Sequence, residues 1–284
     1  MIRVLLQGRL GNNLYQIATG LALAQARKTR LVVDPCLLPE IPNGIVFRRL
    51  PVLQLPFPRR LASVAFDRFN QAARGRHTYE RLSCPAYHEV SHDFDPGVAQ
   101  LGADAVLNGY FQDERHFTGI ADRLPGWFDL TPWKSLAEPG ILEILKGDDT
   151  VGVHVRRSDY LQIPFMQVCG LAYYQRAIER MRQTTPHARF VFFSDDIEWC
   201  REQFAPMNPL IVDHRHHPYG MLIDLGLLSA CRHQIIANSS FSWWAAWLNP
   251  HPARRVLMPD RWTLDGTTAI TTKALRGGEL VATA

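Results

Sequence analysis

The residues best suited to chemistry stand at the end of an apolar stretch, where positions 151–160 read Val-Gly-Val-His-Val-Arg-Arg-Ser-Asp-Tyr. Arg156 and Arg157 carry planar guanidinium groups that suit phosphate, and each such charge-assisted hydrogen bond contributes about 1.5–3 kcal/mol. His154 and Arg156 share one side of the predicted strand, because side chains alternate along it. We expect one arginine to anchor a phosphate and the other to pair with Asp159. The structural alternative is a surface ion pair at a strand end.

A second polar cluster, Ser194, Asp195 and Asp196, follows the apolar residues 190–193. A carboxylate there could accept paired hydrogen bonds from the N1–H and the exocyclic amine of guanine, or ligate a metal. The structural alternative is that Ser194 or Asp195 caps a helix over 197–204. Helix capping and guanine recognition are compatible, because one of the two carboxylates can cap the helix while the other binds the base.

A third cluster follows a later apolar run and precedes a helical pattern of tryptophans. Its members are Asn238, Ser239, Ser240, Phe241 and Ser242. Small hydroxyl residues at a strand-to-helix turn surround an anion with hydroxyls and backbone N–H groups, in the favourable field of the helix N-terminus. A helix cap by Ser240 or Ser242 is the alternative. Trp243, Trp244 and Trp247 have helical spacing, which favours core packing over a sugar-binding platform.

A fourth cluster lies near the start of the chain, where Gly8, Arg9, Gly11, Asn12 and Asn13 follow a short apolar run. The glycines allow a tight turn into a helix, with Asn12 or Asn13 as its N-cap. The pattern resembles a dinucleotide fingerprint but lacks the third glycine, which argues against an NAD site. Arg9 and Asn12 would be well placed to meet a ligand across a cleft from the carboxyl-terminal half.

A histidine-rich stretch, residues 213–217, looks like a metal site but is better explained as a loop. Arg215 within it is a poor neighbour for a cation, and Pro218 follows it directly. We therefore expect no bound metal and no cofactor.

The elements that must position these clusters are short apolar strands alternating with helices, which predicts an α/β fold with parallel sheets. The expected strands are 2–6, 31–33, 105–111, 151–155, 190–193, 210–212, 235–237 and 256–258. The expected helices are 14–22, 61–73, 172–183, 197–204, 219–230 and 242–248. Open α/β sheets bind ligands at the carboxyl ends of their strands. Prolines break the stretch 35–60, and 131–147 looks like a loose boundary, so we place two domains at 1–140 and 141–284.

Composition narrows the class of protein. The 284 residues are 46% hydrophobic, and the net charge of +4 suits a small anionic ligand better than nucleic acid. Five scattered cysteines without a CxxC pair indicate free thiols in a reducing compartment. With no signal peptide and no apolar run of ~18 residues, we expect a cytoplasmic protein without a transmembrane segment. Peripheral attachment to the inner membrane is left open.

Taken together, the four clusters resemble glycosyltransferase family 11, the α-1,2-fucosyltransferases, in their bacterial type. The resemblance is carried by the motifs at residues 8–16, 154–160, 193–196 and 236–244, which appear in the family's order and roughly its spacing. The family implies a GT-B-like fold of two facing Rossmann-like domains. The acceptor would bind on the N-terminal side, and GDP-fucose would bind in the C-terminal domain.

The resemblance also implies a reaction. L-Fucose would move from GDP-β-L-fucose, with inversion and without a metal, to the 2-hydroxyl of a terminal β-galactoside in an oligosaccharide or a lipid-linked glycan. By position, Arg156 would hold the β-phosphate with His154 and Asp159 beside it, Asp195 or Asp196 would recognise guanine, and the three serines of the third cluster would contact the phosphates.

The site residues divide by role. We expect Arg156, Asp159 and Asn12 to act in catalysis. The residues expected to bind the nucleotide sugar are His154, Arg157, Ser194, Asp195, Asp196, Asn238, Ser239, Ser240, Phe241, Ser242, Gly8, Arg9 and Gly11. Asp159 is a candidate base, but pairing with arginine would weaken it, so the base stays unassigned.

Two motifs depart from the family pattern. Ser158 stands where the family has glycine after the arginine pair, and in the motif at residues 8–16 Arg9 and Asn13 replace a glycine and a glutamine. The Arg9 form looks closer to protein O-fucosyltransferases, which leaves the acceptor more open than the donor. The alternatives are a peptide O-fucosyltransferase-like or other GDP-sugar transferase, and a non-catalytic nucleotide-sugar-binding protein.

Overall fold

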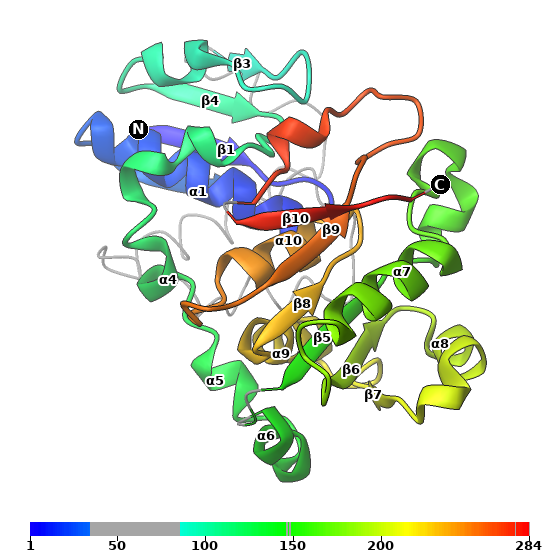
Figure 1. Cartoon of the computed structure of the whole chain (residues 1–284). Coiled ribbons are helices and arrows are strands. Elements are labelled where there is room, and N and C mark those ends of the chain that lie inside the picture. Colours follow the sequence, from blue (N-terminus) through cyan, green and yellow to red (C-terminus); the bar gives the residue numbers. More distant parts are fainter. Residues whose placement is uncertain (35–85, 146, 148, 276, 284) are drawn as a thin grey trace. The chain divides into compact units, whose positions relative to one another are not determined.

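The computed structural model describes residues 1–34, 86–145, 147, 149–275 and 277–283. The chain divides into two compact units, Met1–Asp129 (unit 1) and Leu130–Ala284 (unit 2), and each has its own parallel sheet (Figure 1). The expected α/β fold with parallel sheets is therefore confirmed. The helix expected over 61–73 lies outside the described residues.

Unit 1 carries a four-stranded sheet in the order β2-β1-β4-β3. Its elements, with η marking 3₁₀ helices, are β1 (Ile2–Leu5), α1 (Leu10–Ala26), β2 (Leu31–Asp34), β3 (Ala86–His88), η2 (Pro96–Gln100), β4 (Ala105–Asn108), η3 (Glu114–His116), η4 (Thr118–Ile120) and α4 (Leu124–Trp127). The apolar residues Leu14, Ile17 and Leu21 of α1 are at most 5% exposed, as their helical spacing predicts. β4 ends at Asn108, before the expected residue 111, and Phe111 in the turn that follows has a φ of +51°.

The first helix begins earlier than its polar residues suggested. Arg9 is the N-cap residue with an extended backbone, so the prediction of Asn12 or Asn13 as the cap is wrong. Both asparagines lie in the first turn of the helix, where Asn13 is fully buried. The tight turn rests on Gly8, which has a φ of +74°, whereas Gly11 lies inside the helix.

Unit 2 carries a six-stranded parallel sheet in the order β10-β9-β8-β5-β6-β7. Its elements are α5 (Thr131–Lys134), α6 (Pro139–Leu145), β5 (Thr150–Val155), η5 (Asp159–Gln162), η6 (Pro164–Met166), α7 (Leu171–Arg182), β6 (Arg189–Ser194), α8 (Ile197–Phe204), η7 (Ala205–Met207), β7 (Leu210–Val212), α9 (Gly220–Ala230), β8 (His233–Ile235), α10 (Ser240–Trp247), β9 (Val256–Pro259), η8 (Ile270–Thr272) and β10 (Gly278–Val281). The strands and helices expected beyond residue 150 are confirmed to within about two residues at each end. The last strand, β10, was not expected.

The expectation of a loose stretch over 131–147 is wrong, because this stretch contains the helices α5 and α6. Pro132 lies in the first turn of α5, and Pro139 is the first residue of α6. Proline is tolerated there, since the first N–H groups of a helix have no partner within the helix. The same prolines that suggested a loop therefore begin helices.

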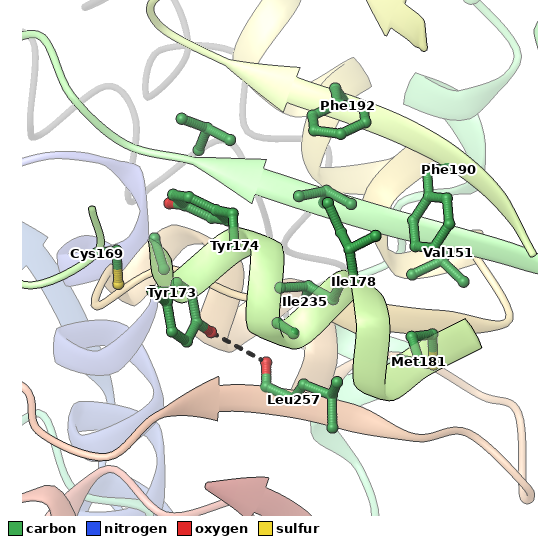
Figure 2. Packing of buried hydrophobic residues seen from close by; sticks show 14 of the residues in the cluster. Val151, Cys169, Tyr173, Tyr174, Ile178, Met181, Phe190, Phe192, Ile235 and Leu257 are labelled. Carbon is green, nitrogen blue, oxygen red and sulfur yellow. Dashed lines mark hydrogen bonds between the residues drawn. The ribbon is translucent and has the colours of Figure 1, made fainter. Parts of the chain in front are cut away.

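In unit 2, helices cover the central strand β5 on both faces of the sheet. Figure 1 shows α7 and α8 on one face of the sheet and α9 and α10 on the other. Figure 2 shows Tyr173, Ile178 and Met181 of α7 packed over Val151 and Ile235, and all five side chains are at most 4% exposed. Burying one large apolar side chain contributes about 1.5–3 kcal/mol, so the strand that carries the arginine pair is firmly anchored.

The tryptophans, the cysteines and the hydropathy of the helices can also be compared with what the sequence predicts. Trp243 and Trp244 are fully buried, which confirms that they pack in the core. Cys169, Cys200 and Cys231 are buried free thiols, and the other two cysteines lie outside the described part of the chain. Within that part, no helix combines the length and hydropathy needed to cross a membrane.

Candidate functional site

The three motifs of unit 2 meet at the carboxyl edge of its sheet. β5 pairs with β6 on one side and with β8 on the other, all in parallel. Residues that follow these strands therefore emerge at the same edge, which is where such sheets bind ligands. The structure brings together residues 154–159, 194–196 and 238–242. A direct link is the Tyr160 hydroxyl, which donates a hydrogen bond to the Asn238 carbonyl at 3.2 Å.

Arg156 lies between two carboxylates. One of its terminal nitrogens, Nη1, is 2.8 Å from Asp195 Oδ2, and the other, Nη2, donates to Asp159 Oδ1. The guanidinium carbon lies 5.3 Å from the ring centroid of Tyr160, and the side chain is 13% exposed. Arg156 is thus the arginine that pairs with Asp159, and the contact of either arginine with a phosphate stays a prediction.

Arg157 has a different set of partners. Its backbone N–H donates to Asp195 Oδ1 at 2.8 Å, and its Nε donates to Asp196 Oδ2 at 3.0 Å. The guanidinium carbon lies 4.1 Å from the ring centroid of Trp199, which is a cation–π contact. Arg157 therefore ties the end of β5 to the start of α8, and Asp195 contacts both arginines.

The N-cap of α8 is Asp196, whose Oδ1 accepts the Trp199 N–H at 3.2 Å. The prediction that Ser194 or Asp195 caps this helix is therefore wrong. Ser194 instead accepts the Asp196 N–H at 2.9 Å through its hydroxyl. Both carboxylates of this motif already bind groups of the protein, and guanine recognition by either one stays a prediction.

His154 is a buried neutral imidazole at the end of β5. Its side chain is 6% exposed, and its ring centroid lies 5.2 Å from that of Phe241. Burial, with a smaller contribution from the Arg156 charge, lowers the pKa of His154 to about 3. The ring nitrogen Nδ1 is buried and has no hydrogen-bond partner among the described residues. His154 thus brings no positive charge to this edge at neutral pH.

The turn before α10 is capped by Ser239, whose hydroxyl accepts the Phe241 N–H at 3.3 Å. The prediction of Ser240 or Ser242 as the cap is therefore wrong. Ser240 and Phe241 are the partly exposed members of this cluster, whereas Ser242 is fully buried. The N-terminus of α10 lies beside the arginine motif, because Phe241 contacts the His154 ring.

Two members of the third cluster make hydrogen bonds inside unit 2. Asn238 Nδ2 donates to the carbonyls of Met166 and Trp262 at 3.0 and 2.9 Å. The Ser242 hydroxyl donates to the Ala237 carbonyl at 3.4 Å. These bonds fix the shape of the turn, and a direct contact of either side chain with a nucleotide stays a prediction.

Sequence reasoning missed two aromatic residues of this edge. The motif at 154–160 gives Tyr160 no role by sequence alone, yet its partly buried hydroxyl joins two motifs, and desolvation raises its pKa to about 12. Trp199 stacks on Arg157, and only its place three residues after Asp196 could have suggested this contact.

The fourth cluster, near the start of the chain, lies at the carboxyl edge of the sheet in unit 1. β1 and β4 pair in parallel with Leu5 beside Asn108, so the residues that follow both strands are neighbours. Asn12 Oδ1 accepts a hydrogen bond from Gln112 Nε2 at 2.7 Å, and both side chains are partly exposed. Arg9 is exposed. Gln112 was missed by sequence reasoning, because its contact with Asn12 depends on a turn that no sequence pattern announces.

The histidine-rich stretch 213–217 forms ion pairs and turns. His214 Nδ1 lies 2.7 Å from Asp224 Oδ1, and Arg215 pairs with Asp213 at 2.9 Å and Glu198 at 3.1 Å. No cluster of three or more His, Cys, Asp or Glu side chains in the described ranges could hold a metal ion. The loop interpretation of this stretch agrees with these contacts.

Comparisons with known proteins give a family match and three informative relatives. The model of glycosyl transferase family 11 matches residues 97–262. The O-antigen biosynthesis glycosyltransferase WbnK of Escherichia coli is 36% identical over 90% of this chain and 93% of its own length. An alpha-1,2-colitosyltransferase of the same organism is 27% identical over 90% of both chains. The galactoside alpha-(1,2)-fucosyltransferase 1 of Oryctolagus cuniculus is 29% identical over 85% of this chain and 62% of its own length.

Solved structures show the same fold at low identity. The fucosyltransferase NodZ from Bradyrhizobium matches with a TM-score of 0.55 and 16% identity, over 88% of this chain and 92% of NodZ. A crystal of NodZ soaked with GDP-fucose matches with a TM-score of 0.54 and 16% identity, over the same shares of the two chains. This likeness confirms the expected GT-B-like fold class.

Proposed function

This chain belongs to glycosyltransferase family 11, and from that membership we propose that it moves L-fucose from GDP-β-L-fucose to the 2-hydroxyl of a terminal β-galactoside. The observation that carries the proposal is the arginine pair at the carboxyl edge of unit 2, beside the N-terminus of α10. The name of the Oryctolagus cuniculus relative supports the sugar and the linkage. In this scheme unit 2 binds the donor and unit 1 binds the acceptor glycan.

Donor binding follows from charge. Arg156 binds the β-phosphate of GDP, because a guanidinium offers parallel N–H donors that match phosphate oxygens. The backbone N–H groups at the start of α10 face anions favourably, since a helix N-terminus carries about half a positive charge. Ser240 and Phe241 are the partly exposed residues there. Arg157, Asp195 and Asp196 position Arg156 and the start of α8.

The reaction breaks the bond between C1 of fucose and the β-phosphate oxygen. The acceptor 2-hydroxyl oxygen attacks C1 from the opposite face, which inverts the configuration, and GDP leaves with the bonding electrons. Negative charge builds on the phosphate as the sugar becomes oxocarbenium-like. Arg156 stabilises that charge, and removing one preorganised donor of this kind typically costs about 10²–10³ in kcat.

The proton of the attacking hydroxyl needs an acceptor. Asp159 is a candidate, but its hydrogen bond with Arg156 makes it a weaker base. A carboxylate of unit 1 or the departing phosphate could also take the proton. Asn12, at the edge of unit 1, is proposed to orient the reacting groups.

A second candidate donor is favoured by one observation. The Escherichia coli relative named alpha-1,2-colitosyltransferase covers 90% of both chains, so a GDP-linked sugar other than fucose is the alternative. A peptide acceptor is a further alternative, because Arg9 departs from the family's first motif. Both alternatives keep the donor site of unit 2. The first changes the sugar that GDP carries, and the second changes the acceptor.

The test combines donor profiling with product detection. GDP-fucose, GDP-mannose and a UDP-sugar are compared by thermal shift, since a ligand that binds only the native state raises the melting temperature. Transfer is then measured with lactose-type acceptors and the preferred donor. We expect GDP-fucose to give the largest shift and a fucosylated galactoside as product. Strong binding with neither transfer nor hydrolysis would instead identify a nucleotide-sugar-binding protein.

A further inference from the structure

A tight turn follows β4 in unit 1, and its backbone is strained at a bulky residue. Phe111 has a φ of +51°, and its side chain is 1% exposed. A bulky residue in the left-handed region is unfavourable and persists only where its surroundings hold it, most often at functional sites. The turn lies at the carboxyl edge of the sheet, where the ends of β1 and β4 are neighbours.

Glu89, directly after β3, holds this turn. Its carboxylate accepts the N–H groups of Tyr110 at 2.6 Å and Phe111 at 2.9 Å. Its own N–H donates to the Asn108 carbonyl at 2.9 Å. A Cβ atom at Gly109 would lie 2.3 Å from Glu89 Cβ, so only glycine allows this approach. One carboxylate thus binds two successive N–H groups of the strained segment.

The turn places Gln112 beside the first helix, α1. Gln112 Nε2 donates to Asn12 Oδ1 at 2.7 Å, and both amide side chains are partly exposed. An amide carries two donors and one acceptor oxygen with two lone pairs, which suits the hydroxyl groups of a neutral sugar. The arginine edge of unit 2 suits phosphate instead, so the two sheets present different chemistry at their carboxyl ends.

We propose that Gln112, together with Asn12, binds hydroxyl groups of the acceptor sugar, and that Glu89 is a positioning residue that holds the turn presenting Gln112. This inference rests on the proposed transfer to a galactoside. It adds the residues of unit 1 that recognise the acceptor.

The first test separates acceptor binding from donor binding. In Gln112→Ala we expect the KM for the acceptor to rise about tenfold, the change expected when about one hydrogen bond to a sugar is lost. The KM for GDP-fucose should stay unchanged. Asp122→Asn, which alters an exposed carboxylate of the same unit, is the matched control and should change neither KM.

Glu89→Gln tests the positioning role. The amide keeps one acceptor oxygen but loses the second, so one N–H of the turn loses its partner. We expect the acceptor KM to rise while the KM for GDP-fucose stays unchanged. A merely structural role would lower the melting temperature and the active fraction without moving either KM. If Glu89→Gln does not fold, Gln112→Ala still decides whether Gln112 binds the acceptor sugar.

Three results would overturn the inference: an unchanged acceptor KM in folded Gln112→Ala, an equal rise of both KM values, or a rise in the donor KM alone. If the wild-type protein transfers no sugar, the proposed function fails and acceptor binding is measured directly. Saturation-transfer NMR with methyl β-galactoside should then show contact with the wild-type protein and lose it in Gln112→Ala. No contact with the wild-type protein, or equal contact with both proteins, contradicts the inference.

Discussion

Arg156 and Asp195 form an ion pair across the neighbouring strands β5 and β6, with 2.8 Å between Nη1 and Oδ2. The other oxygen of the same carboxylate accepts the backbone N–H of Arg157 at 2.8 Å. Asp195 therefore fixes both the direction of one guanidinium and the path of the chain that carries it.

Arg156→Ala should abolish turnover while the fold stays intact. In the proposed reaction the variant loses the cation that neutralises the departing phosphate, and we expect kcat to fall about 10²–10³-fold or more. Its carboxylate partners Asp159 and Asp195 are 38% and 20% exposed, so water can hydrate them in its absence. Steady-state kinetics and circular dichroism check both parts. A variant that keeps most of its activity would remove Arg156 from the mechanism.

Asp195→Asn should weaken catalysis without removing the arginine. The amide oxygen can still accept the Arg157 N–H, but the ion pair with Arg156 is lost. We expect kcat/KM to fall about tenfold and stability to fall by about 1–2 kcal/mol, because the pair is mostly buried. The control is Asp213→Asn, which breaks an exposed pair with Arg215 and should leave the kinetics unchanged. Equal kinetic effects in the two variants would contradict this role of Asp195.

His154 should make the fold sensitive to acid. Its folded-state pKa of about 3 lies below the ordinary value of about 6.5, so the unfolded chain binds a proton that the native state excludes. Stability therefore falls as pH drops below about 6.5, by up to about 1.4 kcal/mol per pH unit from this residue. The stability difference between wild type and His154→Gln should shrink between pH 6.5 and pH 4.5, as measured by urea unfolding. Parallel pH curves for the two proteins would contradict this expectation.

A chelator should leave the rate unchanged, and added Mg²⁺ or Mn²⁺ should not raise it. In the proposed reaction the arginine edge and the N-terminus of α10 supply the positive charge. The side chains of Asp213 and His214 bind Arg215 and Asp224. Initial rates with and without chelator provide the measurement. Strict dependence on a divalent ion would reopen the metal interpretations of 195–196 and 213–217.

The sequence predicted the fold of unit 2 well because its signals are local. Apolar strands of three to six residues, each followed by polar residues, can be recognised in the sequence without knowledge of their spatial neighbours. The predicted helix 197–204 matches α8, and the strand before it matches β6 to within one residue at each end. β10 gave no such signal, since Gly278 and Glu279 interrupt its apolar pattern. Parallel pairing with β9 makes it a strand.

The site was harder to predict, because residues that are distant in sequence but adjacent in space determine which polar side chain caps a helix or binds another group. Three successive residues could cap α8. Asp196 does so because it directly precedes the first helical residue, whereas Asp195 contacts both arginines. In the same way Ser239 precedes the other candidate caps of α10. The role of Glu89 depends on a contact with a distant turn, which spacing along the chain does not reveal.

The carboxylates around Arg156 also affect the residence time of a nucleotide at the proposed donor site. In the proposed reaction a diphosphate approaches a cation, Arg156, that already has anionic partners, so binding would exchange one such partner for another. The net gain in free energy on association would therefore be smaller, and after transfer Asp159 and Asp195 would compete with GDP for the guanidinium. Spent GDP should dissociate more readily, which favours repeated cycles over product retention.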